Sequence, residues 1–294
     1  MTAPPRTDGL PALLIVCVLA VASVVIGAMG VAPSRVTAEE LLGAARDPGE
    51  TAFVAGHRGG TTAAPENTLP AVREALRAGF EYVEVDLVLT ADGHAVLMHD
   101  RTVDRTTDGQ GPVAALTLDE VRDLDAGSWF SPAFAGTQVP TAEEFLDVLA
   151  GSHARAILDL KGTWTPEAAA TLVGSLVERD LERVVAVASF DARTLAYVQA
   201  RSEVVARLIS LKKLPSDIAH AVRQVGARGI LIGRKALEAQ PEVIDELHAA
   251  GLRVIVYTLN SDTQWGRVTD LGVDGIVTDD AGLLYSWQQG LADG

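Results

Sequence analysis

Cysteine is almost absent from this chain: Cys17 is the only one among 294 residues. Because it lies in an apolar run near the N-terminus, no disulfide can form within the rest of the chain. Basic residues are scarce as well, since 24 lysines and arginines stand against 39 aspartates and glutamates, for a formal net charge of −15. A chain this acidic, without a basic stripe, repels nucleic acid backbones. We therefore expect no nucleic acid partner, although a small phosphate could still bind in a local cationic pocket.

One long uncharged run, residues 10–33, stands apart from the rest of the chain. It is long enough to cross a bilayer as a helix, at about 1.5 Å per residue. A secretory signal has a shorter apolar region of about 7–15 residues and a small-x-small cleavage site, which Ala28-Met29-Gly30 matches poorly. We therefore favour an uncleaved transmembrane signal anchor, with a cleaved signal as the alternative. The short tail, residues 1–9, favours a single-pass cell-membrane protein whose large domain lies outside the cytoplasm.

Residues 34–50 are expected to form a short helix or a linker between the membrane and the domain. Beyond this linker, short β-branched runs alternate with longer amphipathic ones through a single domain, residues 51–294. The predicted strands are residues 52–56, 82–89, 95–98, 156–160, 184–188, 204–209, 229–232, 253–257 and 275–278. The predicted helices are residues 67–78, 141–150, 166–179, 192–200, 215–225, 241–250 and 263–271. This alternation indicates parallel strands with right-handed crossovers, and about eight such units match a (β/α)8 TIM barrel. A doubly wound open sheet is the alternative, but Gly59-Gly60 does not complete the GxGxxG fingerprint of dinucleotide binding.

Residues 100–137 interrupt this alternation. They follow a predicted strand, but they are too long and too varied for a simple βα loop. In a barrel, we expect such an insertion to lie over the active-site face.

Two carboxylates interrupt an otherwise apolar predicted strand. Glu84 and Asp86 are two residues apart, so they point to the same face, opposite Val83 and Val85. If they faced solvent they would mark an edge strand, which a closed barrel lacks. If they face the interior they are buried together, which is costly unless a cation or a proton neutralises them. We therefore predict that they bind a divalent metal, Mg²⁺ or Ca²⁺.

Further charged residues stand at the ends of other predicted strands. Asp159 could supply a third metal carboxylate and Lys161 a charge for an anion, although a salt bridge between them is the simpler interpretation. His57 and Arg58 follow the first strand, and His99 follows the third. Each histidine alone would be interpreted as structural. Because the C-terminal ends of barrel strands meet at the catalytic face, however, these residues and the carboxylates form one candidate site.

This set of residues suits the cleavage of a phosphodiester. Two histidines can act as base and acid across one bond. Arg58 and Lys161 match the charge of a phosphate group. Three carboxylates can hold Mg²⁺ or Ca²⁺, whose charge would stabilise the transition state. The sequence therefore predicts metal-assisted phosphodiester hydrolysis.

Several short motifs occur in order along about residues 52–285. They are His57-Arg58-Gly59-Gly60, Pro65-Glu66-Asn67-Thr68, Glu84-Val85-Asp86, His99-Asp100, Asp104-Arg105-Thr106-Thr107-Asp108-Gly109 and Gly272-Val273-Asp274-Gly275-Ile276-Val277-Thr278-Asp279. Each is weak alone, but the ordered series resembles the glycerophosphodiester phosphodiesterase family of phospholipase C-like TIM barrels. The resemblance implies a barrel with an inserted segment, an acid–base pair of His57 and His99, metal ligands Glu84 and Asp86, and phosphate contacts Arg58 and Lys161.

Two positions depart from the pattern of that family. The family usually has Glu-x-Lys where this chain has Asp159-Leu160-Lys161, and the related sphingomyelinase D branch resembles this chain in using Asp there. A late strand usually carries Trp-Thr-Val-Asn where this chain has Tyr257-Thr258-Leu259-Asn260. The resemblance implies that Tyr257 lines the pocket for the substrate alcohol, so this departure bears on substrate preference.

The leading hypothesis is a membrane-anchored enzyme that hydrolyses glycerophosphodiesters to glycerol 3-phosphate and an alcohol. The nucleophile is either water or a neighbouring hydroxyl of the substrate. A second hypothesis is a lysophospholipase D-like enzyme that acts on lysophospholipids in the adjacent bilayer, which the anchor and Asp159 favour. A third is a binding barrel without catalysis, against which the presence of both histidines and both cations argues.

Overall fold

A computed structural model of the protein describes residues 34–292. The anchor predicted at residues 10–33 lies outside these residues. Within the described part of the chain, no helix combines the length and the apolar character needed to span a membrane.

Eight of the nine strands in the described sheet are parallel, and they close into a barrel. β1 (Phe53–Gly56) pairs with β2 (Tyr82–Leu89) on one side and with β9 (Gly275–Thr278) on the other. The strands between them are β4 (Arg155–Leu160), β5 (Val185–Ser189), β6 (Ala206–Leu211), β7 (Gly229–Gly233) and β8 (Arg253–Tyr257). The predicted TIM barrel is therefore confirmed, and the doubly wound open sheet is excluded.

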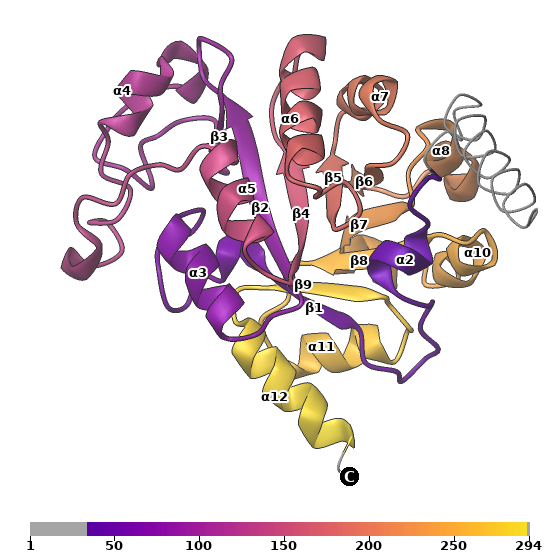
Figure 1. Ribbon diagram of the computed structural model, residues 1–294. Coiled ribbons are helices and arrows are strands. Elements are labelled where there is room, and N and C mark those ends of the chain that lie inside the picture. Colours follow the sequence, from indigo (N-terminus) through magenta and orange to yellow (C-terminus); the bar gives the residue numbers. More distant parts are fainter. Residues whose placement is uncertain (1–33, 293–294) are drawn as a thin grey trace, which may run out of the picture. The chain divides into compact units, whose positions relative to one another are not determined.

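Helices surround the barrel on the outside (Figure 1). They are α3 (Leu69–Arg77), α5 (Ala142–Ala150), α6 (Pro166–Glu178), α7 (Ala192–Arg201), α8 (Ile218–Gln224), α9 (Arg234–Glu238), α10 (Val243–Ala249), α11 (Asp262–Thr269) and α12 (Ala281–Ala292). Thr68, Thr141 and Thr165 begin three of them, because each side chain accepts a hydrogen bond from a backbone N–H of the first turn. Short α9 and terminal α12 are additional to the predicted helices. Because glycine is a poor helix former, Gly282 and Gly290 weaken the helical pattern of α12 in the sequence.

Alternate residues of the strands build two different layers. On β2, Val83 and Val85 point outward and belong to the apolar layer that contains Phe145 of α5. Inside the barrel, Phe53 and Tyr82 stack at the N-terminal ends of β1 and β2, with ring centroids 4.1 Å apart. The interior is thus apolar where the strands begin and acidic where they end, which is the end that carries catalysis in TIM barrels.

Residues 34–50, predicted as a short helix or a linker, close the N-terminal end of the barrel. They contain α2 (Ala38–Leu42), and the buried Leu41 accepts a hydrogen bond at its carbonyl from the Tyr82 hydroxyl at 2.6 Å. Arg253 Nε donates to the carbonyl of Gly43 at 2.9 Å. Because Val36, Leu41 and Leu42 share the interior apolar cluster, this segment is part of the domain, which begins at Arg35.

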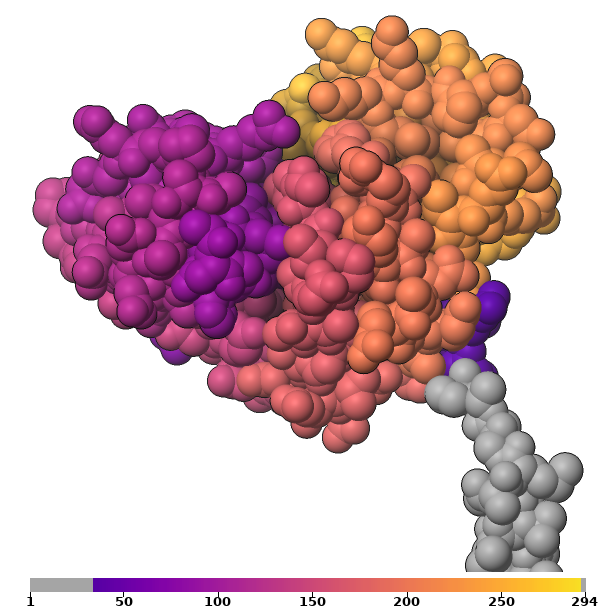
Figure 2. Space-filling model, turned by 90° about the horizontal axis from the view of Figure 1, so that it is seen from above, coloured from indigo at the N-terminus to yellow at the C-terminus, as the bar shows by residue number. Residues whose placement is uncertain are grey.

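The predicted insertion forms a lobe on one side of the barrel, coloured purple to magenta in Figure 2. After β2 the chain turns into β3 (Ala95–Leu97), which runs antiparallel to β2. The lobe then contains two short 3₁₀ turns and α4 (Leu118–Arg122) before the chain reaches α5. It has a small apolar core of its own, made by Val88, Val96, Met98, Val103, Val113, Val121, Ala126 and Val139.

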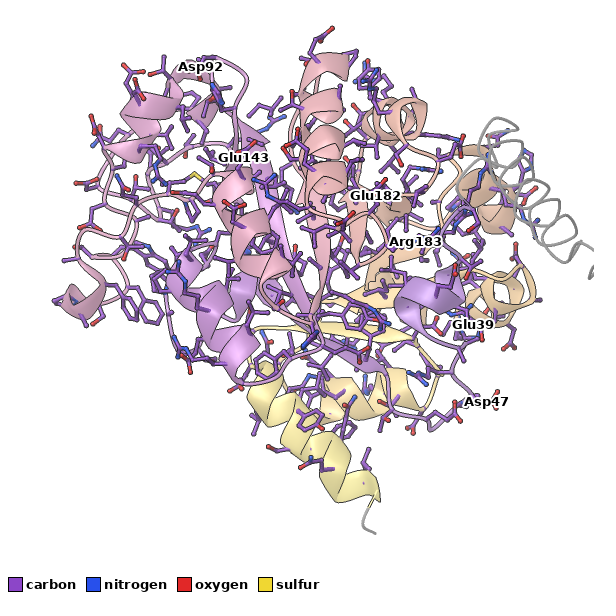
Figure 3. All side chains as sticks on the ribbon, in the orientation of Figure 1. Glu39, Asp47, Asp92, Glu143, Glu182 and Arg183 are labelled. Atoms are coloured by element: carbon purple, nitrogen blue, oxygen red, sulfur yellow. The ribbon has the colours of Figure 1, made fainter. Side chains whose placement is uncertain are left out.

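Side-chain hydrogen bonds hold both ends of α4 in the lobe. Asp92, labelled in Figure 3, accepts from the Thr90 hydroxyl and from the backbone N–H of Leu118 at the start of α4. At the other end, both terminal nitrogens of Arg122 donate to the carboxylate of Glu144 on α5, at 2.6 and 2.8 Å. These contacts hold the insertion against β2 and α5.

Candidate active site

Three carboxylates meet inside the C-terminal end of the barrel. The register of the parallel strands β2 and β4 sets Asp86 directly beside Asp159, and Glu84 is the preceding inward residue of β2. All three are buried, and each offers an oxygen that lies within 4.8 Å of oxygens of the other two. The solvent-facing alternative for Glu84 and Asp86 is therefore excluded, and the short side chain of Asp159 still reaches the cluster.

Burial of these carboxylates in one place shifts their pKa values. Desolvation and the neighbouring charge of Asp86 raise the pKa of Glu84 to about 7. Desolvation also raises the pKa of Asp159. Desolvation would raise the pKa of Asp86 as well, but the charges of Lys161 and Arg58 outweigh desolvation and lower the pKa of that carboxyl. Glu84 is thus the carboxylate whose charge is least compensated, and the one that a bound cation would stabilise most.

Lys161 bridges two of the carboxylates. Its Nζ lies 2.5 Å from Asp159 Oδ2 and 3.1 Å from Asp86 Oδ1, so the salt bridge considered above is present. Burial opposes the charge of the amine, but Asp86 and Asp159 outweigh it and raise the pKa of Lys161. The amine therefore stays protonated at neutral pH and can still meet an anion that enters the site.

A left-handed turn after β1 brings the backbone to the carboxylates. The φ angle is 53° at Arg58 and 87° at Gly59. A Cβ atom on Gly59 would lie 3.0 Å from the backbone nitrogen of Val72 in α3, so glycine is required there. The turn directs the Arg58 N–H at Glu84 Oε2, 2.9 Å away, and brings Arg58 Nε to 3.3 Å from Asp86 Oδ2. The glycines of this motif thus set the position of Arg58.

A carboxylate that the sequence analysis quoted within a motif, but to which it gave no role, holds His57. The Nδ1 atom of His57 lies 2.6 Å from Oδ1 of Asp279, which follows β9, and Asn260 donates to Oδ2 of Asp279 at 2.5 Å. Burial would lower the pKa of His57, but the hydrogen bond to Asp279 and the charge of Glu84 outweigh it, so the pKa is raised. The signal for Asp279 is its position directly after a predicted strand, where a barrel gathers its catalytic groups.

His99 also has a carboxylate partner. Its Nδ1 lies 2.7 Å from Oδ1 of Asp100, and a hydrogen bond from Arg105 is the main cause that lowers the pKa of Asp100 to about 2. An ionised carboxylate beside Nδ1 accepts a hydrogen bond from Nδ1–H, which leaves Nε2 as the basic nitrogen of the neutral ring. The same reasoning applies to His57 beside Asp279, so both rings offer Nε2 to a substrate.

All eight residues named as candidates from the sequence line one cavity of about 200 Å³ at this end of the barrel. They are His57, Arg58, Glu84, Asp86, His99, Asp159, Lys161 and Tyr257. Phe190, which follows β5, lines the same cavity, and burial raises the pKa of the Tyr257 phenol. The cavity therefore combines ionic groups with two aromatic side chains.

Two buried polar atoms of this cavity have no hydrogen-bond partner among residues 34–292. They are the acceptor Asp159 Oδ1 and the donor Arg58 Nε, whose 3.3 Å ion pair with Asp86 is not a hydrogen bond. A buried donor suits an anion and a buried acceptor suits a cation, since buried polar groups are nearly always paired. The three clustered carboxylates also match the oxygen ligands that Mg²⁺ and Ca²⁺ prefer. The residues present therefore fit a divalent metal beside a phosphate.

Comparison with known proteins identifies the family. Residues 57–283 match the glycerophosphoryl diester phosphodiesterase family. The chain belongs to this family. A glycerophosphodiester phosphodiesterase of Caldanaerobacter subterraneus is 31% identical over 243 residues, which cover 80% of this chain and 96% of that protein. A glycerophosphodiester phosphodiesterase of Bacillus subtilis is 30% identical over 251 residues, which cover 80% and 85%.

A solved structure of the same fold agrees. The structure of an Oleispira antarctica phosphodiesterase in complex with the product sn-glycerol-3-phosphate aligns with a TM-score of 0.73 at 26% identity, covering 83% of this chain and 98% of that one. The resemblance noted from the ordered motifs is therefore confirmed, and the chain is an enzyme of the glycerophosphoryl diester phosphodiesterase family.

Proposed function

We propose that the enzyme hydrolyses glycerophosphodiesters to glycerol 3-phosphate and an alcohol, and that it needs a divalent metal, Mg²⁺ or Ca²⁺. The observation that carries this proposal is the joint presence in one cavity of two carboxylate-paired histidines, three clustered carboxylates and two cations. The product bound in the Oleispira antarctica structure supports the choice of substrate.

The charged groups bind the phosphate in this proposal. Arg58 offers a planar fork of donors and Lys161 a compact charge, and the two together suit a phosphodiester. Glu84, Asp86 and Asp159 would hold the metal, which supplies charge stabilisation for the transition state when it is bound. Arg58 Nε, a donor without a hydrogen-bond partner, supports the binding of an anion here, and Asp159 Oδ1, an acceptor without one, supports the binding of a cation.

The two histidines move the protons. Nε2 of one ring takes the proton of the nucleophile, and Nε2 of the other gives a proton to the oxygen of the leaving alcohol. Asp279 and Asp100 hold the two rings with Nδ1 protonated. We assign the alcohol of the substrate to the side of the cavity lined by Tyr257.

The direct test uses the full-length protein and glycerophosphocholine. We expect chelation to abolish release of glycerol 3-phosphate and added Mg²⁺ or Ca²⁺ to restore it. Without a cation, the buried carboxylates would repel the phosphate, and the charge of the transition state would lack the stabilisation that a metal supplies. Lysophosphatidylcholine is assayed in parallel. Hydrolysis of the lysolipid alone would favour the lysophospholipase D-like alternative. Undiminished activity after chelation would contradict the metal requirement, and folded protein inactive on both substrates would contradict the proposed function.

We also propose that residues 10–33 anchor the enzyme in the cell membrane, with the catalytic domain outside the cytoplasm. The length of this uncharged run supports the proposal. The full chain is expected to sediment with membranes until detergent is added, whereas a chain that starts at residue 34 stays in the supernatant. Protease added to intact cells should digest the domain. Recovery of the full chain in the soluble fraction, or protection from that protease, would argue against the anchor.

A further inference from the structure

Arg105 of the insertion lies at the centre of a network of ion pairs. Its Nη1 and Nη2 atoms each lie 2.8 Å from one oxygen of Glu66. Its Nε lies 2.7 Å from Asp100 Oδ2, and Nη2 lies 3.2 Å from Asp100 Oδ1. Asp100 Oδ1 also lies 2.7 Å from His99 Nδ1, and Glu66 Oε1 also lies 2.6 Å from Arg58 Nη1. One guanidinium thus connects the partner of a histidine with the partner of a phosphate-binding arginine.

The network joins two segments that are separate in the fold. Asp100 and Arg105 belong to the insertion after β3, whereas Arg58 and Glu66 belong to the connection between β1 and α3. Positive and negative groups alternate along it. Burial opposes the charge of Glu66, but the hydrogen bond from Arg105 and the charge of Arg58 outweigh burial and lower the pKa of its carboxyl. Glu66 is therefore an anion shared between two arginines.

Arg105 has no substitute in this arrangement. Within residues 34–292, Asp100 makes side-chain hydrogen bonds only with His99 and Arg105. Without Arg105, Asp100 would be free to rotate away from His99, and Glu66 would pair with Arg58 alone. Lysine cannot replace it fully, because an ammonium group is a point charge and cannot form two bidentate contacts at once.

We propose that Arg105 is a positioning residue, which fixes the His99 ring and the Arg58 guanidinium relative to each other by holding Asp100 and Glu66 together. This inference rests on the hydrolytic function proposed above. It assigns the insertion a part in the geometry of the site. A reacting group that is misplaced by about 1 Å can lose about a hundredfold in rate, so such a device would act mainly on kcat.

We expect Arg105→Met to lower kcat on glycerophosphocholine by about tenfold to a hundredfold. KM should rise less than kcat falls, because Arg58 keeps its charge and its contacts with Glu66 and Asp86. Arg105→Lys should recover part of the loss. The matched control is Arg122→Met, which removes a bidentate ion pair of the same insertion that contacts neither histidine. It should keep the wild-type kcat while lowering the melting temperature at least as much.

Two results would overturn the proposal. Wild-type kcat in Arg105→Met would mean that the network does not position His99. Equal losses of kcat in Arg105→Met and Arg122→Met would mean that Arg105 only attaches the insertion to the barrel.

The ring of His99 can also be observed without a substrate. Long-range ¹H–¹⁵N spectra of the full-length protein distinguish the two neutral tautomers, and His99→Gln identifies the signals. We expect the Nδ1–H tautomer in the wild type and in Arg122→Met, and a mixture in Arg105→Met. An unchanged ring in Arg105→Met would overturn the proposal. If the wild type were inactive while Arg105→Met changed the tautomer, the positioning would be supported and the proposed reaction would fail separately.

Discussion

Each of the variants His57→Ala and His99→Ala is expected to hydrolyse glycerophosphocholine about 10²–10⁴ times more slowly than the wild type, which is the usual contribution of general acid–base catalysis. Each ring lines the cavity, and a carboxylate holds its Nδ1, which leaves Nε2 to exchange a proton with the substrate. Removing either ring removes one of the two proton transfers and leaves the phosphate contacts in place. The loss should therefore fall on kcat, measured under saturating substrate, with the melting temperature as the measure of folding.

A histidine outside the site provides the control. His220 lies exposed on α8, where its ring contacts Gln224, so His220→Ala should keep wild-type turnover. Because the two rings are proposed to act on one bond, the double variant of His57 and His99 should be little slower than the slower single variant. Wild-type turnover in either single variant would contradict the acid–base assignment. If the loss of turnover in the double variant equals the product of the two single losses, the two rings act independently rather than on one bond.

Two patterns explain how sequence reasoning located this site. In a parallel strand that is buried on both faces, carboxylates at alternate positions have only the interior of the barrel to face, and Glu84 and Asp86 do so. His57 and Asp159 each stand at the C-terminal end of a parallel strand, and those ends meet on one face of a barrel. These local patterns gather the two residues and the carboxylates of β2 around one cavity. The same rule does not explain His99, because β3 runs antiparallel to β2 and His99 reaches the cavity where the chain returns beside β2.

Contacts between distant segments could not be predicted in the same way. Asp86 lies beside Asp159 because of the register between β2 and β4, which depends on pairing between strands rather than on either strand alone. Asp279 is 222 residues from His57, and Arg105 is 39 residues from Glu66. The contacts of residues 34–50 with the barrel likewise depend on partners far along the chain, such as Arg253. Contacts between such distant residues leave no periodic pattern in the local sequence.

Glu84→Gln is expected to change stability and activity in opposite directions. The pKa of Glu84 is raised from an ordinary value of 4.5 to about 7. In the metal-free protein, the unfolded chain releases this proton above about pH 4.5 while the folded chain keeps it to about pH 7. The free energy of unfolding therefore falls as the pH rises through this window. Glutamine cannot ionise, so the metal-free variant should be more stable than the metal-free wild type at about pH 8, and the difference should vanish at about pH 4.

Activity should fall in the same variant by about 10²–10³ in kcat/KM, because charge stabilisation by a bound metal is worth several kcal/mol. Added Mg²⁺ or Ca²⁺ should raise the melting temperature of the wild type and raise that of Glu84→Gln much less. The control is Glu39→Gln, an exposed glutamate of α2 at the other end of the barrel (Figure 3), which should match the wild type throughout.

Two results together would contradict the metal site. The metal-free wild type would lose no stability relative to Glu84→Gln as the pH rises, and neither Mg²⁺ nor Ca²⁺ would stabilise it. The expected pair of results has a physical meaning of its own. A carboxylate that destabilises the empty protein at neutral pH, yet is required for turnover, is retained for the ligand it binds rather than for the fold. The same reasoning extends to Asp159, whose pKa burial also raises. It does not extend to Asp86, because Lys161 and Arg58 lower the pKa of that carboxyl and so stabilise its charged form.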